Sequence, residues 1–299
     1  MGETLHGGAS RGRLLGHQGP VLAVRFTATG EYCLTAGKDR TVRLWNPATC
    51  LCIKAYEGHG NEVREAQASP DNSRICSAGG DRQVFLWDVA RARTVRRFRG
   101  HDAAVNAVCF GAGGAVVVSG GYDQAVKAWD CRSQSIDAIQ SVTCCRDSVT
   151  SVAVEGAAIY AASVDGTVVT LDVRMGRSVV DTLGPPVVCL RPSHDGKSLL
   201  AACLGGSLRL LDRGSGAALA RYAGHINDAV KLDCDFTSTD AYVVAGSEDG
   251  CIYYWDLVSA NIVKSWKAHG STVCSLACHP RGEMLLSAAV DGVCEVWQG

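Results

Sequence analysis

The chain lacks the features that mark membrane, secreted or nucleic-acid-binding proteins. No apolar run approaches the roughly 18 residues that a membrane-spanning helix needs, and residues 1–8 lack the apolar core of a signal peptide. Its 29 basic and 30 acidic residues leave a net charge of −1 at pH 7. Without a basic excess we expect no direct binding of nucleic acid, and without an apolar span no membrane contact. Sustained helical periodicity is also missing, which argues against a helical fold.

Signatures of disulfide frameworks and metal sites are absent too, although the chain has 15 cysteines. Several lie in apolar, strand-like stretches, where a free thiol behaves as a small hydrophobic group: Cys76, Cys109, Cys189, Cys203 and Cys274. The pairs Cys50/Cys52 and Cys144/Cys145 are too closely spaced for zinc, and Cys274, Cys278 and His279 lack a second pair of ligands. We therefore expect no metal and no cofactor.

What the chain does contain is a long repeat. A tryptophan, or a leucine in its place, recurs in steps of 42, 42, 42, 40, 44 and 42 residues: Trp45, Trp87, Trp129, Leu171, Leu211, Trp255 and Trp297. Periods of this length are typical of repeat architectures. Seven units fill the chain and leave almost no room for a catalytic domain. We place them at 16–57, 58–99, 100–142, 143–183, 184–223, 224–267 and 268–299.

A second pattern repeats inside each unit. A Gly-His or Ala-His pair opens five units, at His17, His59, His101, His225 and His269. An aspartate follows after 22 residues in four units and after 24 in the sixth, and a tryptophan comes six residues later: Asp39, Asp81, Asp123, Asp291 and Asp249. Three of these tryptophans precede an aspartate. The chain therefore resembles the WD-repeat family, whose signature is a Gly-His pair and a Trp-Asp pair at this period.

Each unit also contains four stretches with strand character. In the second unit they are residues 63–68, 74–77, 84–88 and 94–99, separated by segments rich in Gly, Pro, Asp and Asn. We predict an all-β fold, a single seven-bladed propeller with four antiparallel strands in each blade. The last unit ends after its third strand. Residues 12–15 stand where a fourth strand precedes the other Gly-His pairs, so we predict that they close the last blade and remove its exposed edge.

Histidine, hydroxyl and aspartate sets such as His59, Ser77 and Asp81 have the composition of a catalytic triad. Because the set recurs in several blades, we interpret it as structural and expect no catalytic residues and no enzyme activity. In the WD-repeat family these groups and the tryptophan form a buried hydrogen-bonded tetrad. The resemblance implies four complete tetrads: His17, Thr35, Asp39, Trp45; His59, Ser77, Asp81, Trp87; His101, Ser119, Asp123, Trp129; and His269, Ser287, Asp291, Trp297.

The remaining blades depart from this pattern. The sixth has Ala245 at the hydroxyl position, the fourth has Leu171 for tryptophan, and the fifth has Gly205 and Leu211 in place of aspartate and tryptophan. We then expect blades 4 and 5 to be the least stable part of the ring, unless packing of the leucines replaces the hydrogen-bond network at no loss of stability. An enzyme that uses the propeller funnel would need a single, non-repeated polar cluster at the axis, and the sequence shows none.

Propellers usually recruit proteins on the face that carries the loops before the first strand and between the second and third. The repeat register places mixed charged and aromatic residues there: Lys38, Glu62, Arg64, Tyr122, Arg146, Asp228, Lys231 and Glu248. A basic run, Arg91, Arg93, Arg96, Arg97 and Arg99, lies around the last strand of blade 2, and is either a solvated strand or a contact for phosphate or an acidic partner. Trp-Asp-x-Arg patterns end at Arg132 and, in degenerate form, at Arg174. They resemble adaptor contacts of cullin-RING ubiquitin-ligase substrate receptors, which is the alternative function.

A closer resemblance extends to residues outside the repeat motif. Matching segments are residues 32–35, 44–47, 71–73, 97–101, 129–133, 208–212 and 231–234, and the unusual fourth blade at 163–166 and 171–176. They look like WD-repeat scaffolds that organise a mitogen-activated protein kinase cascade and that also occur with the spliceosome. Gly205, where an aspartate is expected, is a departure. The resemblance implies a non-enzymatic scaffold in cytoplasm and nucleus, monomeric within larger assemblies, whose partners are splicing factors or kinase-cascade proteins.

Overall fold

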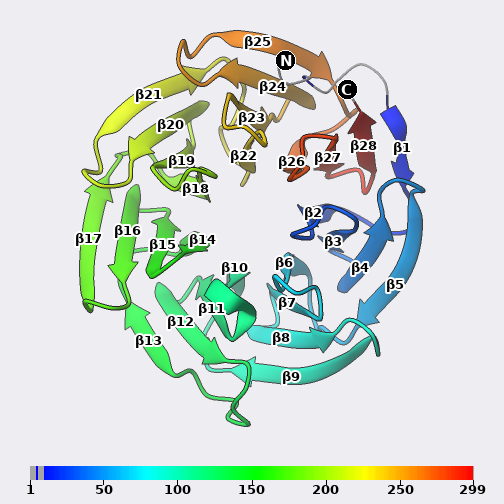
Figure 1. Cartoon of the computed structure of the whole chain (residues 1–299), viewed down its shortest axis with the longest axis vertical. Helices are drawn as coiled ribbons and strands as arrows, with labels where there is room; N and C mark the ends of the chain where they lie inside the picture. The colour runs from blue at the N-terminus through cyan, green and yellow to red at the C-terminus, as the bar shows by residue number, and fades with distance from the viewer. Residues whose placement is uncertain (1–4, 6–9, 299) are drawn as a thin grey trace.

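The computed structural model describes residues 5 and 10–298, which form seven four-stranded antiparallel sheets around a central axis (Figure 1). This is the seven-bladed β-propeller that the repeat predicts. Within the described residues the only helical element is a 3-10 turn, η1, at Ala112–Gly114. In every blade the first strand lies nearest the axis and the last lies at the rim (Figure 1).

Blades 1 to 3 are formed by consecutive strands of the chain. Their strands are β2 (Val21–Phe26), β3 (Cys33–Gly37), β4 (Thr41–Asn46) and β5 (Leu51–Glu57); β6 (Val63–Ala68), β7 (Arg74–Gly79), β8 (Gln83–Asp88) and β9 (Arg93–Arg99); β10 (Val105–Phe110), β11 (Val116–Gly121), β12 (Ala125–Asp130) and β13 (Gln140–Thr143). The second blade thus has the four strands that its sequence pattern predicts.

Blades 4 to 6 continue in the same order. Their strands are β14 (Val149–Glu155), β15 (Ala158–Ser163), β16 (Thr167–Asp172) and β17 (Arg177–Thr182); β18 (Val187–Pro192), β19 (Ser198–Cys203), β20 (Ser207–Asp212) and β21 (Ala218–Ala223); β22 (Cys234–Phe236), β23 (Tyr242–Gly246), β24 (Cys251–Asp256) and β25 (Ile262–Lys267). The inner strand β22 has only three residues, and residues 224–233 before it form a loop without strand structure.

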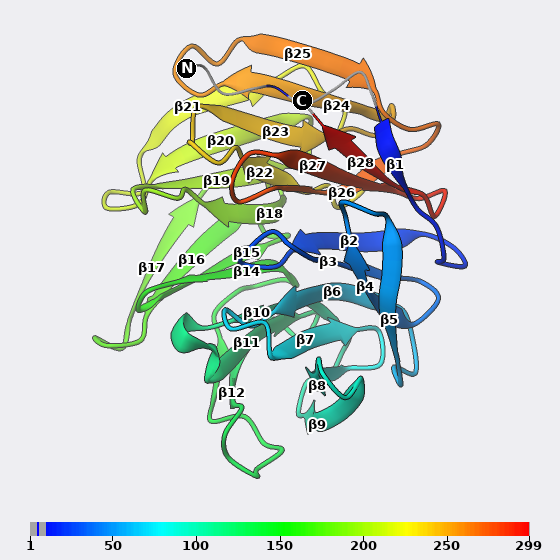
Figure 2. The ribbon, with the colours of Figure 1, turned by 45° about the vertical axis from the view of Figure 1, so that its right-hand side comes forward.

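The seventh blade joins the two ends of the chain. It contains β26 (Val273–Cys278), β27 (Met284–Ala289), β28 (Cys294–Gln298) and, as its outer strand, β1 (Ser10–Leu14), which pairs antiparallel with β28 (Figure 2). The predicted closure is confirmed, but the strand is Ser10–Leu14 rather than 12–15. Leu15 lies outside it and is 67% exposed, whereas Leu14 is buried in the core between blades 7 and 1.

Tight turns between the second and third strands depend on the repeated aspartate. The carboxylate of Asp39 accepts a hydrogen bond from the N–H of Thr41, and that of Asp81 accepts one from the N–H of Gln83. The intervening residue adopts a left-handed conformation, with φ of 67° at Arg40 and 63° at Arg82. The left-handed conformation is unfavourable for these residues, and the hydrogen bonds to the preceding Asp stabilise the turn that requires it.

The core lies between blades. At four junctions the repeat tryptophan packs against an aromatic ring on the preceding blade's outer strand, with ring centroids 5.4 to 6.4 Å apart: Tyr56–Trp87, Phe98–Trp129, Tyr222–Trp255 and Trp266–Trp297. Between blades 3 and 4 both aromatic partners are missing. Val142 and Leu171 stand in their places and line a hollow of about 160 Å³. Leu211, by contrast, is 2% exposed and packs in the next junction.

Candidate protein-binding site at the channel mouth

A cavity of about 460 Å³ opens at one mouth of the central channel. Five of the eight residues predicted for the partner-binding face line it: Lys38, Glu62, Arg64, Tyr122 and Lys231. Sequence reasoning missed the rest of the lining, which is largely apolar and comes from the same loops and inner strands: Pro20, Leu22, Asn106, Ser148, Thr150, Val164, Val230, Cys274 and Val290. The site therefore combines an apolar cup with charged groups of both signs.

Arg64 organises the charged side of this cavity. Its Nη2 lies 2.8 Å from Glu62 Oε1, its Nη1 donates to Asn106 Oδ1 at 2.6 Å, and its guanidinium stacks 5.3 Å from the centre of the Tyr122 ring. Lys231 reaches the same place from blade 6 and donates from Nζ to the Asn106 carbonyl at 3.4 Å. Tyr122 itself is 54% exposed. The arrangement presents cations, a carboxylate and an open aromatic ring to solvent, which suits specific protein recognition.

The other three predicted face residues do not line the cavity. Glu248 instead shapes the loop that carries Val230 and Lys231, because its Oε1 accepts the N–H groups of Asp228, Ala229 and Val230 at 2.9, 2.8 and 3.1 Å. The hydrogen bond from Ala229, with those from its neighbours, lowers the pKa of the Glu248 carboxyl. Arg146 is exposed, and its backbone N–H donates to Asp165.

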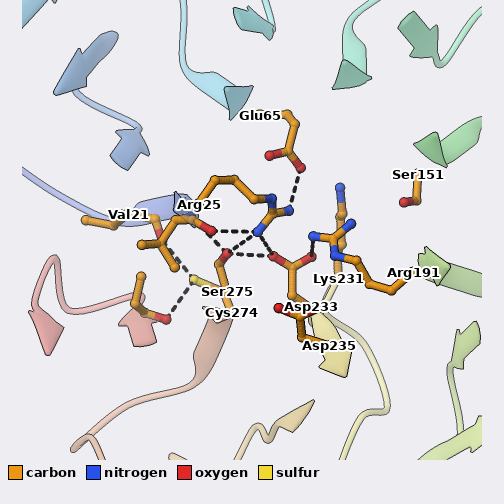
Figure 3. A network of polar contacts seen from close by, with 12 residues as sticks. Val21, Arg25, Glu65, Ser151, Arg191, Lys231, Asp233, Asp235, Cys274 and Ser275 are labelled. Carbon is orange, nitrogen blue, oxygen red and sulfur yellow. Dashed lines mark hydrogen bonds and ion pairs between the residues drawn. The ribbon is translucent and has the colours of Figure 1, made fainter. Parts of the chain in front are cut away.

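Inner strands also bring a polar cluster to the axis (Figure 3). Arg25 on β2 places Nη2 2.7 Å from Glu65 Oε2 on β6 and Nη1 2.7 Å from Asp233 Oδ2, just before β22. Ser275 on β26 donates to the same Asp233 oxygen at 2.6 Å, and Arg191 Nη2 on β18 lies 3.9 Å from Asp233 Oδ1. Five blades are thus tied together across the channel.

This cluster corrects the expectation that the axis holds no non-repeated polar group. Burial opposes the charge on Asp233, but Arg25 and Arg191 outweigh it and hold the pKa of that carboxyl well below its usual range. Asp233 is 3% exposed and hydrogen-bonded to two blades, so it stabilises the ring as an ion-paired bridge. The sequence signal was present in part, because Arg25 and Arg191 are the charged residues of otherwise apolar inner strands.

The structure brings three predicted tetrads together completely. In blade 2, His59 Nδ1 lies 2.8 Å from Asp81 Oδ2, His59 Nε2 lies 2.7 Å from Ser77 Oγ, and Trp87 Nε1 donates to the same hydroxyl at 2.8 Å. Equivalent contacts join His17, Asp39, Thr35 and Trp45 in blade 1, and His101, Asp123, Ser119 and Trp129 in blade 3. The histidine and aspartate side chains of these tetrads are at most 9% exposed, and none of the twelve residues lines the mouth cavity.

Blade 7 departs from its predicted tetrad. His269 Nε2 and Trp297 Nε1 both contact Ser287 Oγ, at 2.7 and 2.8 Å. Within residues 10–298, however, no hydrogen bond joins His269 to Asp291. The Asp291 carboxylate caps the turn by accepting the N–H of Val293, and its own N–H donates to Ser271. The network of this blade is therefore a triad of histidine, serine and tryptophan.

Blade 6 leaves polar groups unpaired where its hydroxyl is missing. Both ring nitrogens of His225 and both amide atoms of Asn227 are buried without a hydrogen-bond partner in the described structure. Burial lowers the pKa of His225 to about 4. Trp255 Nε1 donates instead to the Ala223 carbonyl at 3.0 Å. With alanine at position 245, the histidine and tryptophan of this blade have no shared hydroxyl partner.

The two Trp-Asp-x-Arg arginines lie away from the mouth cavity. Arg132 follows β12, its side chain is 74% exposed, and its Nε lies 3.4 Å from Asp130 Oδ1. Arg174 follows β16 and is also exposed, and its backbone N–H donates to Asp172 Oδ1 at 2.8 Å. Both carboxylates cap the turn that presents the arginine.

In residues 5 and 10–298, no three or more His, Cys, Asp and Glu side chains are grouped so that they could hold a metal ion. All 15 cysteines are free thiols. Across the described part of the chain, no helix has the length and apolar character needed to cross a membrane.

Known proteins share this architecture. The family model described as WD domain, G-beta repeat matches residues 8–46, 50–88, 92–130, 216–256 and 260–298, leaving out the two blades that lack the tryptophan. WD repeat domain-containing protein 83 is similar to the chain in several species. The rat protein (Rattus norvegicus) is 53% identical and the human protein (Homo sapiens) 51%, each over 94% of this chain and 89% of the relative. The zebrafish protein (Danio rerio) is 48% identical over 94% and 89%.

Proposed function

The chain belongs to the WD-repeat family, and on that premise we propose that it is a scaffold that holds protein partners at the channel mouth. WD-repeat propellers are typically non-enzymatic interaction scaffolds. The observation that carries the proposal is the mouth cavity, where loops and inner strands of several blades surround an apolar cup with Lys38, Arg64, Lys231 and Glu62. A cavity with an apolar lining and charges of both signs suits recognition of a specific protein surface better than a surface with charges of one sign.

We propose further that the partners are splicing factors and components of a mitogen-activated protein kinase cascade. Support comes from the resemblance of segments outside the repeat motif, the fourth blade included. A rigid ring that binds two partners at once raises their local concentration without any chemistry of its own. In this proposal the protein acts as a monomer within larger assemblies, in both nucleus and cytoplasm.

Affinity purification of the tagged protein from its own cells, followed by mass spectrometry, tests the proposal. The test variant carries Glu62→Arg with Lys231→Glu, which reverses both signs at the mouth. The matched control carries Glu31→Arg with Lys197→Glu, the same exchange at two exposed positions outside the cavity lining. We expect splicing or kinase-cascade proteins to be lost from the mouth variant and retained by the control.

Two other outcomes contradict the proposal in different ways. Equal recovery of those partners from both variants would remove the mouth as the binding site. Recovery of a cullin adaptor that is lost on Arg132→Ala or Arg174→Ala, but not in the mouth variant, would favour a ubiquitin-ligase substrate receptor instead. Both arginines are exposed, so these substitutions leave the core intact.

A further inference from the structure

The outer strand of blade 2 carries arginines that form no ion pair within the described residues. Along β9, Arg93, Arg97 and Arg99 are exposed and Arg96 is half-buried. Over the described residues, none of the four has a carboxylate oxygen within 4.0 Å, and Arg91, just before the strand, is the only arginine of the run with an ion pair. Because the whole chain has a net charge of −1, this concentration of positive charge is local. We call Arg93, Arg96, Arg97 and Arg99 the arginine edge.

Aromatic rings hold two of these guanidinium groups in place. Arg97 lies over the Phe85 ring at 5.0 Å from its centre, and Arg96 lies 6.0 Å from the centre of the Phe98 ring. Both rings are 1% exposed and belong to the cores on either side of the blade. Nη1 of Arg96 is buried without a hydrogen-bond partner. Positive charges fixed in this way lose little side-chain freedom when an anion binds.

The outer backbone edge of β9 is open before Arg99. The strand order in this sheet is β6-β7-β8-β9, so within the described chain no strand pairs with the outer edge of β9. One group of this edge is already bonded, because Arg99 donates its N–H to the Ile136 carbonyl at 3.3 Å, on the side away from β8. Because backbone groups alternate along a strand, those of Arg97 point to the same open side. An unpaired edge of this kind accepts an added strand.

From these observations we propose that the arginine edge is a docking strip for an acidic protein segment. The segment lies along β9 in extended conformation, as a fifth strand of blade 2. Its carboxylates stand at alternate positions, about 6.8 Å apart, which is the spacing of Arg97 and Arg99 along a strand. Backbone hydrogen bonds supply the register and the ion pairs supply the selectivity for acidic residues.

An acidic peptide fits this surface better than a nucleic acid does. Single-stranded nucleic acids stack their bases on exposed aromatic rings. Here Phe85 and Phe98 are already buried beneath guanidinium groups, and the exposed uncharged side chain on the strand is Val95, which is aliphatic. The open backbone edge also offers hydrogen bonds that another peptide backbone matches and a phosphodiester chain does not.

This strip does not depend on the binding proposed for the channel mouth. Blade 2 contributes Glu62 and Arg64 to the mouth from near its inner strand β6, whereas β9 lies at the rim of the ring (Figure 1). A protein held on the rim thus leaves the mouth free. One propeller can then carry two partners at once, with the selectivity of each set by different residues.

Fluorescence anisotropy with synthetic peptides tests the docking strip. The probe is a labelled peptide of alternating glutamate and valine, compared with a glutamine-for-glutamate version, a peptide of the same composition with all glutamates in one block, and an oligouridine RNA. The test variant carries Arg93→Glu with Arg99→Glu, which spares the packed Arg96 and Arg97. The control carries Arg177→Glu with Arg221→Glu, exposed arginines on the outer strands of blades 4 and 5.

We expect the alternating peptide to bind, with at least about a tenfold weaker affinity in the test variant and an unchanged affinity in the control. Hydrogen exchange at residues 93–99 should slow when this peptide binds. The proposal is overturned if no peptide binds, if the glutamine or block peptide binds as well as the alternating one, or if the RNA binds more tightly. None of these results bears on binding at the mouth, because Glu62 and Lys231 are unchanged in every variant.

Discussion

At the scale of single residues, a complete tetrad uses each of its side-chain donors once. Trp87 Nε1–H donates to Ser77 Oγ, the hydroxyl donates to Nε2 of a neutral His59, and Nδ1–H of the same ring donates to Asp81. Asp81 also accepts the N–H of Gly60 at 3.0 Å, which ties the loop before the inner strand to the turn. Within the described residues His59 Nε2 is the one acceptor within reach of the Ser77 hydroxyl, so this pattern assigns the ring proton to Nδ1.

Removing that hydroxyl should destabilise the ring. Ser77→Ala leaves the Trp87 indole and the His59 ring without a shared partner in a fully buried place, which costs about 3 kcal/mol of unfolding free energy. Urea denaturation measures this loss. Ser178→Ala, at an exposed position on β17, is the control and should be neutral. A cost for Ser77→Ala no larger than that of the control would contradict the structural role of the tetrad.

Blade 6 permits the converse experiment. Ala245 is 1% exposed and pairs with Tyr253 as Ser77 pairs with Phe85, so a serine there stands next to the unpaired His225. We expect Ala245→Ser to raise the free energy of unfolding by about 1 kcal/mol, because one buried nitrogen gains a partner. Urea denaturation is again the measurement. Loss of stability would show that the site has no room for a hydroxyl.

The buried His225 also makes stability depend on pH. Burial lowers its folded-state pKa to about 4, below the value of about 6.5 for an exposed histidine, so the unfolded chain binds more protons between these two values. Stability contributed by the neutral ring is therefore present above about pH 6.5 and falls as pH drops toward 4, by at most about 1.4 kcal/mol per pH unit. His225→Phe should flatten this part of the curve, whereas Ser178→Ala, at an exposed and non-titrating position, should leave it unchanged. Equal slopes in all three proteins would contradict the assignment.

At the scale of elements, the junction between blades 3 and 4 lacks both of the aromatic rings that fill four other junctions, and it contains a hollow. Val142 pairs with Val126 as Phe98 pairs with Val84, but it lacks the ring that packs against the next blade. Val142→Phe should occupy the hollow of about 160 Å³ and raise the free energy of unfolding by about 1 kcal/mol. Thermal denaturation measures this. Val263→Phe on the exposed face of β25 adds the same ring without a hollow and should have no effect; a gain there of equal size would refute cavity filling.

Local patterns predicted most of the elements. Turn residues at fixed offsets place all four strands of blade 2, because alternation and Asp-centred turns are properties of neighbouring residues. The closing strand was misplaced because its register is decided by pairing with β28, where a bulge between Ser10 and Gly12 shifts the partners. Likewise, the loop before β22 could not be predicted, since Glu248 from the next hairpin holds it.

At the scale of the whole molecule, long-range contacts escaped the sequence. Arg25 and Asp233 are 208 residues apart, and nothing in a repeat pattern indicates that they meet at the axis. The mouth was predicted in part, because the repeat register alone places Lys38, Glu62, Arg64, Tyr122 and Lys231 on one face. Its apolar lining was not predicted, because the sequence pattern of those residues is that of ordinary core residues. Only the closed ring shows that they line a cavity.

Closure of the ring should govern its cooperativity. Deleting residues 1–16 removes β1, with the buried Leu14 and the bonds of Ser10 and Arg13 to Glu295, and exposes the edge of β28. Loss of the Leu14 packing alone costs about 2–5 kcal/mol. We expect a lower melting temperature and faster hydrogen exchange in distant blades such as blade 4. Faster exchange confined to blade 7 would show that this blade unfolds locally, and it would contradict the predicted effect on the whole ring.

Photo-crosslinking from Tyr122 tests the central claim, that a protein partner occupies the channel mouth, most directly. Tyr122 lines the cavity and is 54% exposed, so a benzoylphenylalanine there would sit within reach of any bound chain. The control position is Val258, which is 90% exposed and lies outside the lining. The account predicts covalent capture of a protein in cells from position 122, abolished by Glu62→Arg with Lys231→Glu. Capture from position 258 alone, or capture from 122 that survives those substitutions, would contradict it.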